Sequence, residues 1–246
     1  MKDKIVKITP EYLTNIFSSK IFTDALKKCA DISYSKHIET SFSINQDFSN
    51  PNFALERIIK GDYGKIDSSS KDIYDKEADH FKNYPLIDLH FHYPCYDNET
   101  IVPSEMDLQA FLSTSSWELF DCQNEVSEYA TRVIFAIASI YAEKNIEALL
   151  FQTKNDKLTQ SFMEGVSLKL EDLGETKNRN KEVIKILKEN CLNAGIISYK
   201  RTKEGYKLAN PDVLKKFASS PKFIRKIDYE KDFEEMKNTD TDNQPI

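Results

Sequence analysis

The segment PLIDLHFHYP, residues 85–94, limits what this chain can fold into more than any other stretch. Polar and apolar residues alternate in it with a period of two, which predicts a β-strand with one buried face. The buried face would carry three apolar side chains, those of Ile87, Leu89 and Phe91. The opposite face would carry three polar ones, those of Asp88, His90 and His92. Because residues i and i+2 of a strand lie roughly 7 Å apart, the two imidazoles can converge on one ion.

A metal ion at this position needs a further ligand, and the next predicted helix offers one. A catalytic zinc site commonly takes three nitrogen or oxygen ligands from the protein and keeps a fourth position for water. Residues 103–107, PSEMD, predict a helix start with Ser104 as the N-cap and an acid three residues later. Asp107 is the nearest suitable third ligand beside His90 and His92. The Ser104 hydroxyl is placed to donate a hydrogen bond to a developing negative charge.

The rest of the chain predicts an α/β protein. Apolar residues recur with a helical period in three segments, residues 10–30, 157–172 and 181–192. Strand patterns occur in four segments, residues 37–44, 55–60, 132–142 and 146–152. The last two strands are apolar enough to be central in a sheet. The remaining expectations are a polar loop, a hairpin and a final helix, at residues 61–83, at 195–208 and from about 211.

The composition is that of a globular protein that stays in a reducing compartment. Hydrophobic residues make up 40% of the chain and charged residues 30%. The sequence has no apolar run long enough for a membrane helix and no secretory signal pattern. The four cysteines are widely spaced and form no CxxC pair, which argues against a disulfide framework. We therefore expect a cytoplasmic protein without a membrane partner.

The charge is unevenly distributed along the chain. Residues 177–228 hold 14 Lys and Arg against 5 Asp and Glu, a net charge of +9, and residues 229–246 carry −4. This leaves −11 for residues 1–176, within a total of −6. The pattern predicts a metal-binding domain at 1–176, a basic helix–hairpin–helix appendage at 177–228 and a mobile acidic tail.

Four sequence elements follow one another in a characteristic order. They are Glu39 on an early predicted strand, His90-Phe91-His92 on a later one, Pro94, and Ser104-Glu105-Met106-Asp107 at a helix start. In this order the chain resembles the JAMM (JAB/MPN) zinc metalloproteases, over about residues 10–155.

The resemblance implies a fold and a chemistry. The fold would be an αβα sandwich around a mixed sheet, as in the JAMM and deaminase-like proteins. His90, His92 and Asp107 would hold Zn²⁺. Glu39 would be the general base, and Ser104 would help to stabilise the oxyanion. The substrate would be a peptide or isopeptide, such as the C-terminus of a ubiquitin-like protein.

The sequence departs from the family pattern around the expected cleft. Phe91 stands between the histidines, where Ser or Thr is usual, and Tyr93 separates His92 from the proline that usually follows it directly. Residues 93–103 form a longer connection to Ser104 than is usual. These differences leave the ligand set intact and alter the substrate cleft.

A second resemblance competes with the first. IDLHFH, residues 87–92, is similar to the opening strand of amidohydrolases and PHP phosphoesterases. Those sites need several further histidines downstream. The chain has 4 histidines in total and none after His92, so the sequence favours the JAMM interpretation.

The sequence therefore predicts a zinc-dependent hydrolase of peptide or isopeptide bonds. The alternative is a non-catalytic JAMM-like scaffold that binds a partner protein. A third hypothesis concerns residues 177–228, whose positive charge could contact nucleic acid or an acidic partner. Asp88, on the histidine face, could orient a ligating imidazole or simply be solvated.

Overall fold

The protein is represented by a computed structural model. It describes residues 8–47, 53–61, 71–75, 83–92, 101–115, 118–119, 127–130, 134–140, 145–153, 160–173, 179–190, 192–217 and 222–226.

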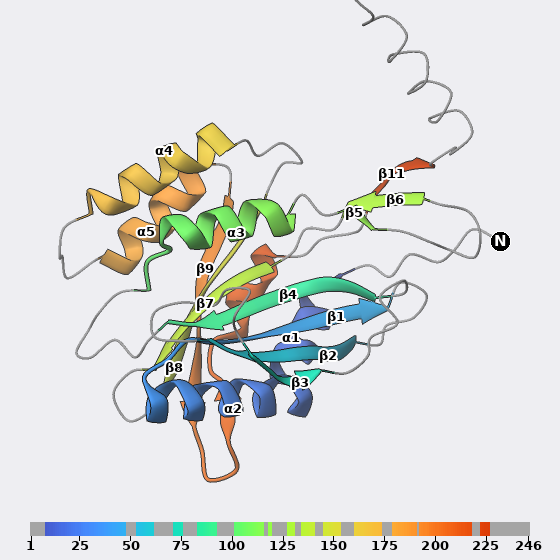
Figure 1. Cartoon of the computed structure of the whole chain (residues 1–246), viewed down its shortest axis with the longest axis vertical. Coiled ribbons are helices and arrows are strands. Elements are labelled where there is room, and N and C mark those ends of the chain that lie inside the picture. Colours follow the sequence, from blue (N-terminus) through green and yellow to red (C-terminus); the bar gives the residue numbers. More distant parts are fainter. Residues whose placement is uncertain are drawn as a thin grey trace, which may run out of the picture.

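Eight strands form the main sheet: β1 (Thr40–Asp47), β2 (Phe53–Lys60), β3 (Lys71–Asp75), β4 (Asn83–Phe91), β7 (Ile134–Ile140), β8 (Ile146–Thr153), β9 (Leu192–Arg201) and β10 (Tyr206–Leu208). Their order across the sheet is β10-β9-β8-β7-β4-β1-β2-β3 (Figure 1). β4 and β7 pair in parallel, and the other neighbouring strands pair antiparallel. Three short strands form a second sheet: β5 (Glu118–Leu119), β6 (Ser127–Ala130) and β11 (Lys222–Lys226).

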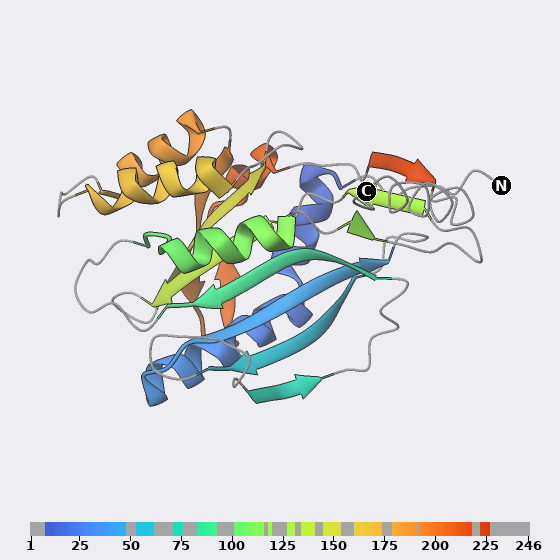
Figure 2. The same cartoon turned by 45° about the horizontal axis from the view of Figure 1, so that its top comes forward.

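Helices cover both faces of the main sheet. One face carries α1 (Pro10–Ser18), α2 (Lys20–Lys36) and the 3-10 helix η2 (Pro211–Lys216). The other carries α3 (Glu105–Ser115), α4 (Gln160–Glu171) and α5 (Arg179–Glu189). Figure 2 shows α2 and the group of α3, α4 and α5 on opposite sides of the twisted sheet. This arrangement confirms the predicted α/β class. Within the described part of the chain, no helix is both long and apolar enough to cross a membrane.

The apolar runs in β7 and β8 explain why these strands lie in the middle of the sheet. Every residue of β7 is buried, and in β8 only Glu147 is partly exposed. Alternate residues enter two cores. Ala136 and Ala138 pack toward α1 and α2, whereas Phe135 and Ile137 pack toward α3, α4 and α5. A strand covered on both faces needs such an uninterrupted apolar sequence.

The helix predicted over residues 10–30 is two helices in the structure. Ser19 lies between α1 and α2 with an extended backbone, at ψ 154°. Its amide donates to the Ile16 carbonyl at 3.0 Å and its hydroxyl accepts from the Phe22 amide at 3.2 Å. One serine thus ends the first helix and caps the second, a role that apolar periodicity does not reveal.

Two further expectations differ from the structure. Part of the stretch predicted as loop, residues 61–83, forms β3, which pairs with β2 at the edge of the sheet. The final helix expected from residue 211 is the six-residue 3-10 helix η2, which ends at Lys216. The tail from residue 227 lies outside the described residues.

The main sheet continues into the basic segment 177–228. β9 pairs with β8 from Leu192 to Tyr199, and α5 packs on the sheet through Val183 and Leu187. The predicted hairpin is present as β9 and β10. The division of the chain after residue 176 stays a prediction.

Two glycines offer a matched test of this packing. A Cβ added to Gly195 of β9 would meet Val213 Cγ1 at 2.6 Å, whereas one added to Gly165 of α4 would meet nothing within 4 Å. We expect Gly195→Ala to destabilise the protein by roughly 1–3 kcal/mol because the stiff valine must move. Gly165→Ala should stabilise it by about 0.5–1 kcal/mol through helix propensity. Urea denaturation of both variants measures the two effects, and equal shifts would contradict this account of β9 and η2.

Candidate metal site

The two histidines lie where β4 ends. Phe91 between them is fully buried in the core under α2, which turns His90 and His92 to the opposite face of the sheet. The amide of His92 donates to the Ala138 carbonyl of β7 at 3.0 Å and so extends the parallel pairing. The imidazole rings are 4.9 Å apart between centroids.

Asp107 reaches the histidines from the first turn of α3. Its Oδ1 lies 3.0 Å from His90 Nε2, and its Oδ2 lies 3.1 Å from His92 Nε2. The three potential ligand atoms all lie within 4.8 Å of one another. The side chains of His90 and Asp107 are only 10% and 13% exposed, so the group is largely shielded from solvent. His90, His92 and Asp107 can therefore hold a metal ion.

Ser104 fixes the position of Asp107. The Asp107 amide donates to Ser104 Oγ at 3.2 Å, and the Ser104 amide donates to Asp107 Oδ2 at 2.6 Å. This reciprocal pair is the predicted cap of α3. The Ser104 hydroxyl also donates to Asp107 Oδ2, at 2.8 Å. Its orientation toward Asp107 means that the hydroxyl would have to turn to reach a substrate.

One buried nitrogen at the site is left without a hydrogen bond. His90 Nε2 is close to Asp107 Oδ1, yet the contact is not aligned as a hydrogen bond, and the nitrogen has no other hydrogen-bond partner among the described residues. Buried polar atoms seldom remain unsatisfied. Two imidazole nitrogens and one carboxylate are a typical catalytic zinc set. The donor atoms therefore fit zinc.

The charges at the site are strongly coupled. Burial alone would raise the pKa of Asp107, but its contacts with His90 and His92 lower that pKa well below the usual range. For His90, burial alone would lower the pKa. The contact with Asp107 and the charges of Glu39 and Asp88 outweigh this effect, so the pKa of His90 is raised. Asp88 thus acts on His90 from the same face of β4.

Glu39 reaches the site through the pairing of β1 with β4. Ser41 is paired with His90, so Glu39, two residues earlier, projects to the same face beside His92. Its carbonyl accepts from the Gly61 amide at 3.0 Å, which ties this end of β1 to the end of β2. Burial raises the pKa of the partly buried Glu39 carboxyl, and His92 and His90 offset part of this increase. A carboxylate with a raised pKa near two ligands is suited to accept a proton from water.

The comparisons with known proteins add no relative. No protein-family model, curated protein or solved structure matches the chain. The assignment of the site therefore depends on its own geometry.

The structure also shows two polar residues that the sequence did not single out. Ser139 of β7 and Glu147 of β8 pair across the strands on the face that carries the histidines. Each stands inside an apolar run, where a single polar residue gives little signal. Their pairing with one another and with the end of β4 becomes visible only through the strand register.

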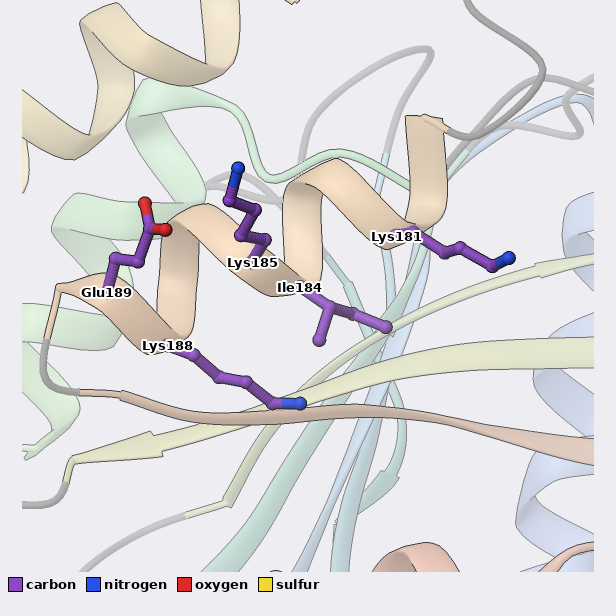
Figure 3. Close-up of a pocket in the computed structure, with 5 residues that line it drawn as sticks. All are labelled: Lys181, Ile184, Lys185, Lys188 and Glu189. Atoms are coloured by element: carbon purple, nitrogen blue, oxygen red, sulfur yellow. The ribbon is translucent and has the colours of Figure 1, made fainter.

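A separate pocket lies along α5, away from the residues predicted to act in catalysis. It has a volume of about 400 Å³ and is lined by Lys181, Ile184, Lys185, Lys188 and Glu189. Figure 3 shows all five side chains projecting from this one helix. Glu189 is the one carboxylate among them, and within the described part of the chain the group that could hold a metal ion is at His90, His92 and Asp107, so this pocket is not a second metal site.

The coupled charges predict opposite pH dependences with and without metal. In chelator-treated protein, the raised pKa of His90 gives a stabilisation that is complete below its unfolded value of about 6.5 and is lost as the pH rises through the folded value. The lowered pKa of Asp107 gives a stabilisation that is present above about 3.9 and is lost as the pH falls toward the folded value. Zinc-loaded protein should instead gain stability as the pH rises, because protons compete with zinc for the ligands.

Thermal unfolding of wild type and Asp107→Asn at about pH 5.5 and pH 8.5 tests this difference. Without metal, the free energy of unfolding of the wild type should exceed that of Asp107→Asn by on the order of 1–2 kcal/mol at the lower pH, and by less at the higher pH. Asp24→Asn, which removes a surface ion pair with Lys20, is the control and should show little change. A metal-free advantage that is constant across this range would contradict the charge assignment.

Proposed function

We propose that this chain is a zinc-dependent hydrolase of peptide or isopeptide bonds, of the JAMM type. The observation that carries the proposal is the convergence of His90, His92 and Asp107, with Glu39 projecting to the same face of the sheet. Three ligands with a carboxylate outside the ligand set are what metal-assisted hydrolysis needs.

Each residue has a separate role in the proposed reaction. Zinc, when bound, polarises the scissile carbonyl and lowers the pKa of a water molecule. Glu39 accepts the proton of the attacking water and passes it to the leaving amine. His90, His92 and Asp107 would hold the zinc ion, and the cap of α3 keeps the Asp107 carboxylate beside the two imidazoles. The partial burial of Glu39 keeps its carboxylate weakly solvated and therefore more basic.

Ser104 has two parts in the proposal. Its hydroxyl donates to Asp107 as part of the cap. In catalysis, the same hydroxyl would turn toward the substrate and donate to the oxyanion. The proposed setting is cytoplasmic, and the proposed substrate is a peptide or the C-terminus of a ubiquitin-like protein.

A second function is supported by a different surface. Lys181, Lys185 and Lys188 lie on α5, are exposed and line the α5 pocket. Ammonium groups spaced along a helix can follow the phosphates of a nucleic acid. We propose that residues 177–228 can bring the hydrolase to nucleic acid.

The affinity for single-stranded RNA should then fall steeply as the salt concentration rises. Fluorescence anisotropy measures this affinity for the wild type and for the double variant Lys181→Gln/Lys188→Gln, which should bind more weakly. Equal binding by the variant would speak against this surface.

The metal assignment predicts a simple stoichiometry. Purified protein should contain about one zinc ion per chain, as the three converging ligands require. His92→Ala should lose most of this zinc, whereas His37→Ala, which changes an exposed histidine at the end of α2, should keep it. Elemental mass spectrometry gives the ratio. A folded wild-type protein that holds no zinc after addition of the metal would move the function to a non-catalytic scaffold.

The base assignment predicts a separation of binding from turnover. Glu39→Gln should keep zinc and lower kcat by on the order of 10²–10⁴-fold, because the attacking water loses its proton acceptor. Glu164→Gln on the exposed side of α4 is the matched control and should keep full activity. Cleavage of ubiquitin-like chains and of a peptide mixture, followed by mass spectrometry, provides the assay. Full activity of Glu39→Gln would show that another group is the base.

A further inference from the structure

A row of polar side chains continues from the metal site across the sheet. The hydrogen bond from the His92 amide to the Ala138 carbonyl extends the β4–β7 register by one residue and sets His92 beside Ser139. Ser139 is paired with Glu147 of β8, and Glu147 with Ser198 of β9. Paired residues on neighbouring strands project to the same face. The row therefore runs from His92 through Ser139 to Glu147.

The row lies on the same side of the sheet as the third ligand. Ile137 and Leu149 lie two residues from Ser139 and Glu147 and belong to the core under α3, α4 and α5. Asp107 comes from this helix layer. Neighbouring strands are about 4.8 Å apart, so Glu147 lies roughly 10 Å from His92 at Cα. A long substrate side chain that flanks a bond held at the metal can span this distance and reach Glu147.

Ser139 is unusual among the residues of its strand. It is the one hydroxyl residue in the sequence IFAIASI, and it is fully buried. Its Oγ makes no hydrogen bond to any of the described residues. Because buried hydroxyls are nearly always hydrogen-bonded, this atom is available to a neighbouring carboxylate or a ligand.

Glu147 supplies a negative charge that the described structure does not balance. The carboxyl is partly buried, and burial raises its pKa without an offsetting cation among the described residues. A partly desolvated carboxylate becomes more favourable when a cation pairs with it. The hydroxyl of Ser139 can donate to the same carboxylate and fix its orientation.

We propose that Glu147 and Ser139 form a substrate-binding subsite for a lysine or arginine side chain that flanks the scissile bond. Glu147 pairs with the cation, and Ser139 is a positioning residue whose hydroxyl, unpaired among the described residues, donates to the Glu147 carboxylate once the cation is bound. This inference rests on the proposed function, since it places the subsite beside the bond that the metal site would cleave. It narrows the substrate class to basic peptides.

The test compares two peptides that differ in one side chain. Acetyl-Gly-Gly-Lys-Gly-Gly-amide and its norleucine counterpart are titrated into zinc-treated Glu39→Gln protein by calorimetry, so that turnover does not interfere. The lysine peptide should bind roughly fivefold to tenfold more tightly, as expected for a partly buried ion pair. Adding Glu147→Gln should abolish this preference without changing the affinity for the norleucine peptide.

Two further variants separate positioning from folding. Ser139→Ala should reduce the preference for lysine only partly and leave the norleucine peptide unaffected, which a general loss of structure would not do. Glu164→Gln, on the surface of α4, should keep the full preference. The absence of a lysine preference, or a preference that survives Glu147→Gln, would overturn the subsite.

The zinc content of the same samples distinguishes the two proposals. Protein that holds zinc but does not prefer lysine would overturn the subsite and leave the hydrolase proposal standing. Protein that prefers lysine through Glu147 but holds no zinc would overturn the hydrolase proposal and support the subsite as a binding site.

Discussion

The parallel pairing of β4 with β7 is the constraint on which the candidate site depends. Parallel neighbours need a crossover connection, and α3 lies in that connection. The crossover has to run back along the sheet before β7 can begin. α3 therefore starts near the end of β4, where the side chains of His90 and His92 project. An antiparallel β7 could have followed β4 through a short turn, and Asp107 would then have no reason to face the histidines.

Asp107 belongs both to the cap of α3 and to the candidate metal site. Its Oδ2 accepts from the Ser104 amide, the Ser104 hydroxyl and His92 Nε2, while Oδ1 faces His90. A carboxylate in the first turn is also favoured by the helix dipole. The interactions that start α3 therefore also orient the third candidate ligand. Little side-chain freedom remains to be lost when a cation binds, which favours affinity.

The sequence predicted the parts of the site that have local signals. The alternation around His90 and His92 and the S-x-x-D pattern at Ser104 sufficed to identify three residues that the structure brings together, and the cap of α3. The apolar runs identified β7 and β8 as central strands. Ser19, by contrast, was missed as a helix boundary because the apolar period continues through it. β3 was missed because an edge strand needs little apolar sequence, and the row through Ser139 and Glu147 required the register of three strands.

The chain between His92 and Ser104 is anchored at both ends, by the β4–β7 hydrogen bond on one side and by the capped helix on the other. The entropy of joining two fixed points by a flexible chain grows only with the logarithm of the chain's length, at about 0.6 kcal/mol for each doubling. Residues can therefore be added to or removed from this connection at small energetic cost while the three candidate ligands keep their places. For the proposed hydrolase, this separation means that the sequence of the connection can diverge quickly, and substrate choice with it, while His90, His92 and Asp107 remain unchanged.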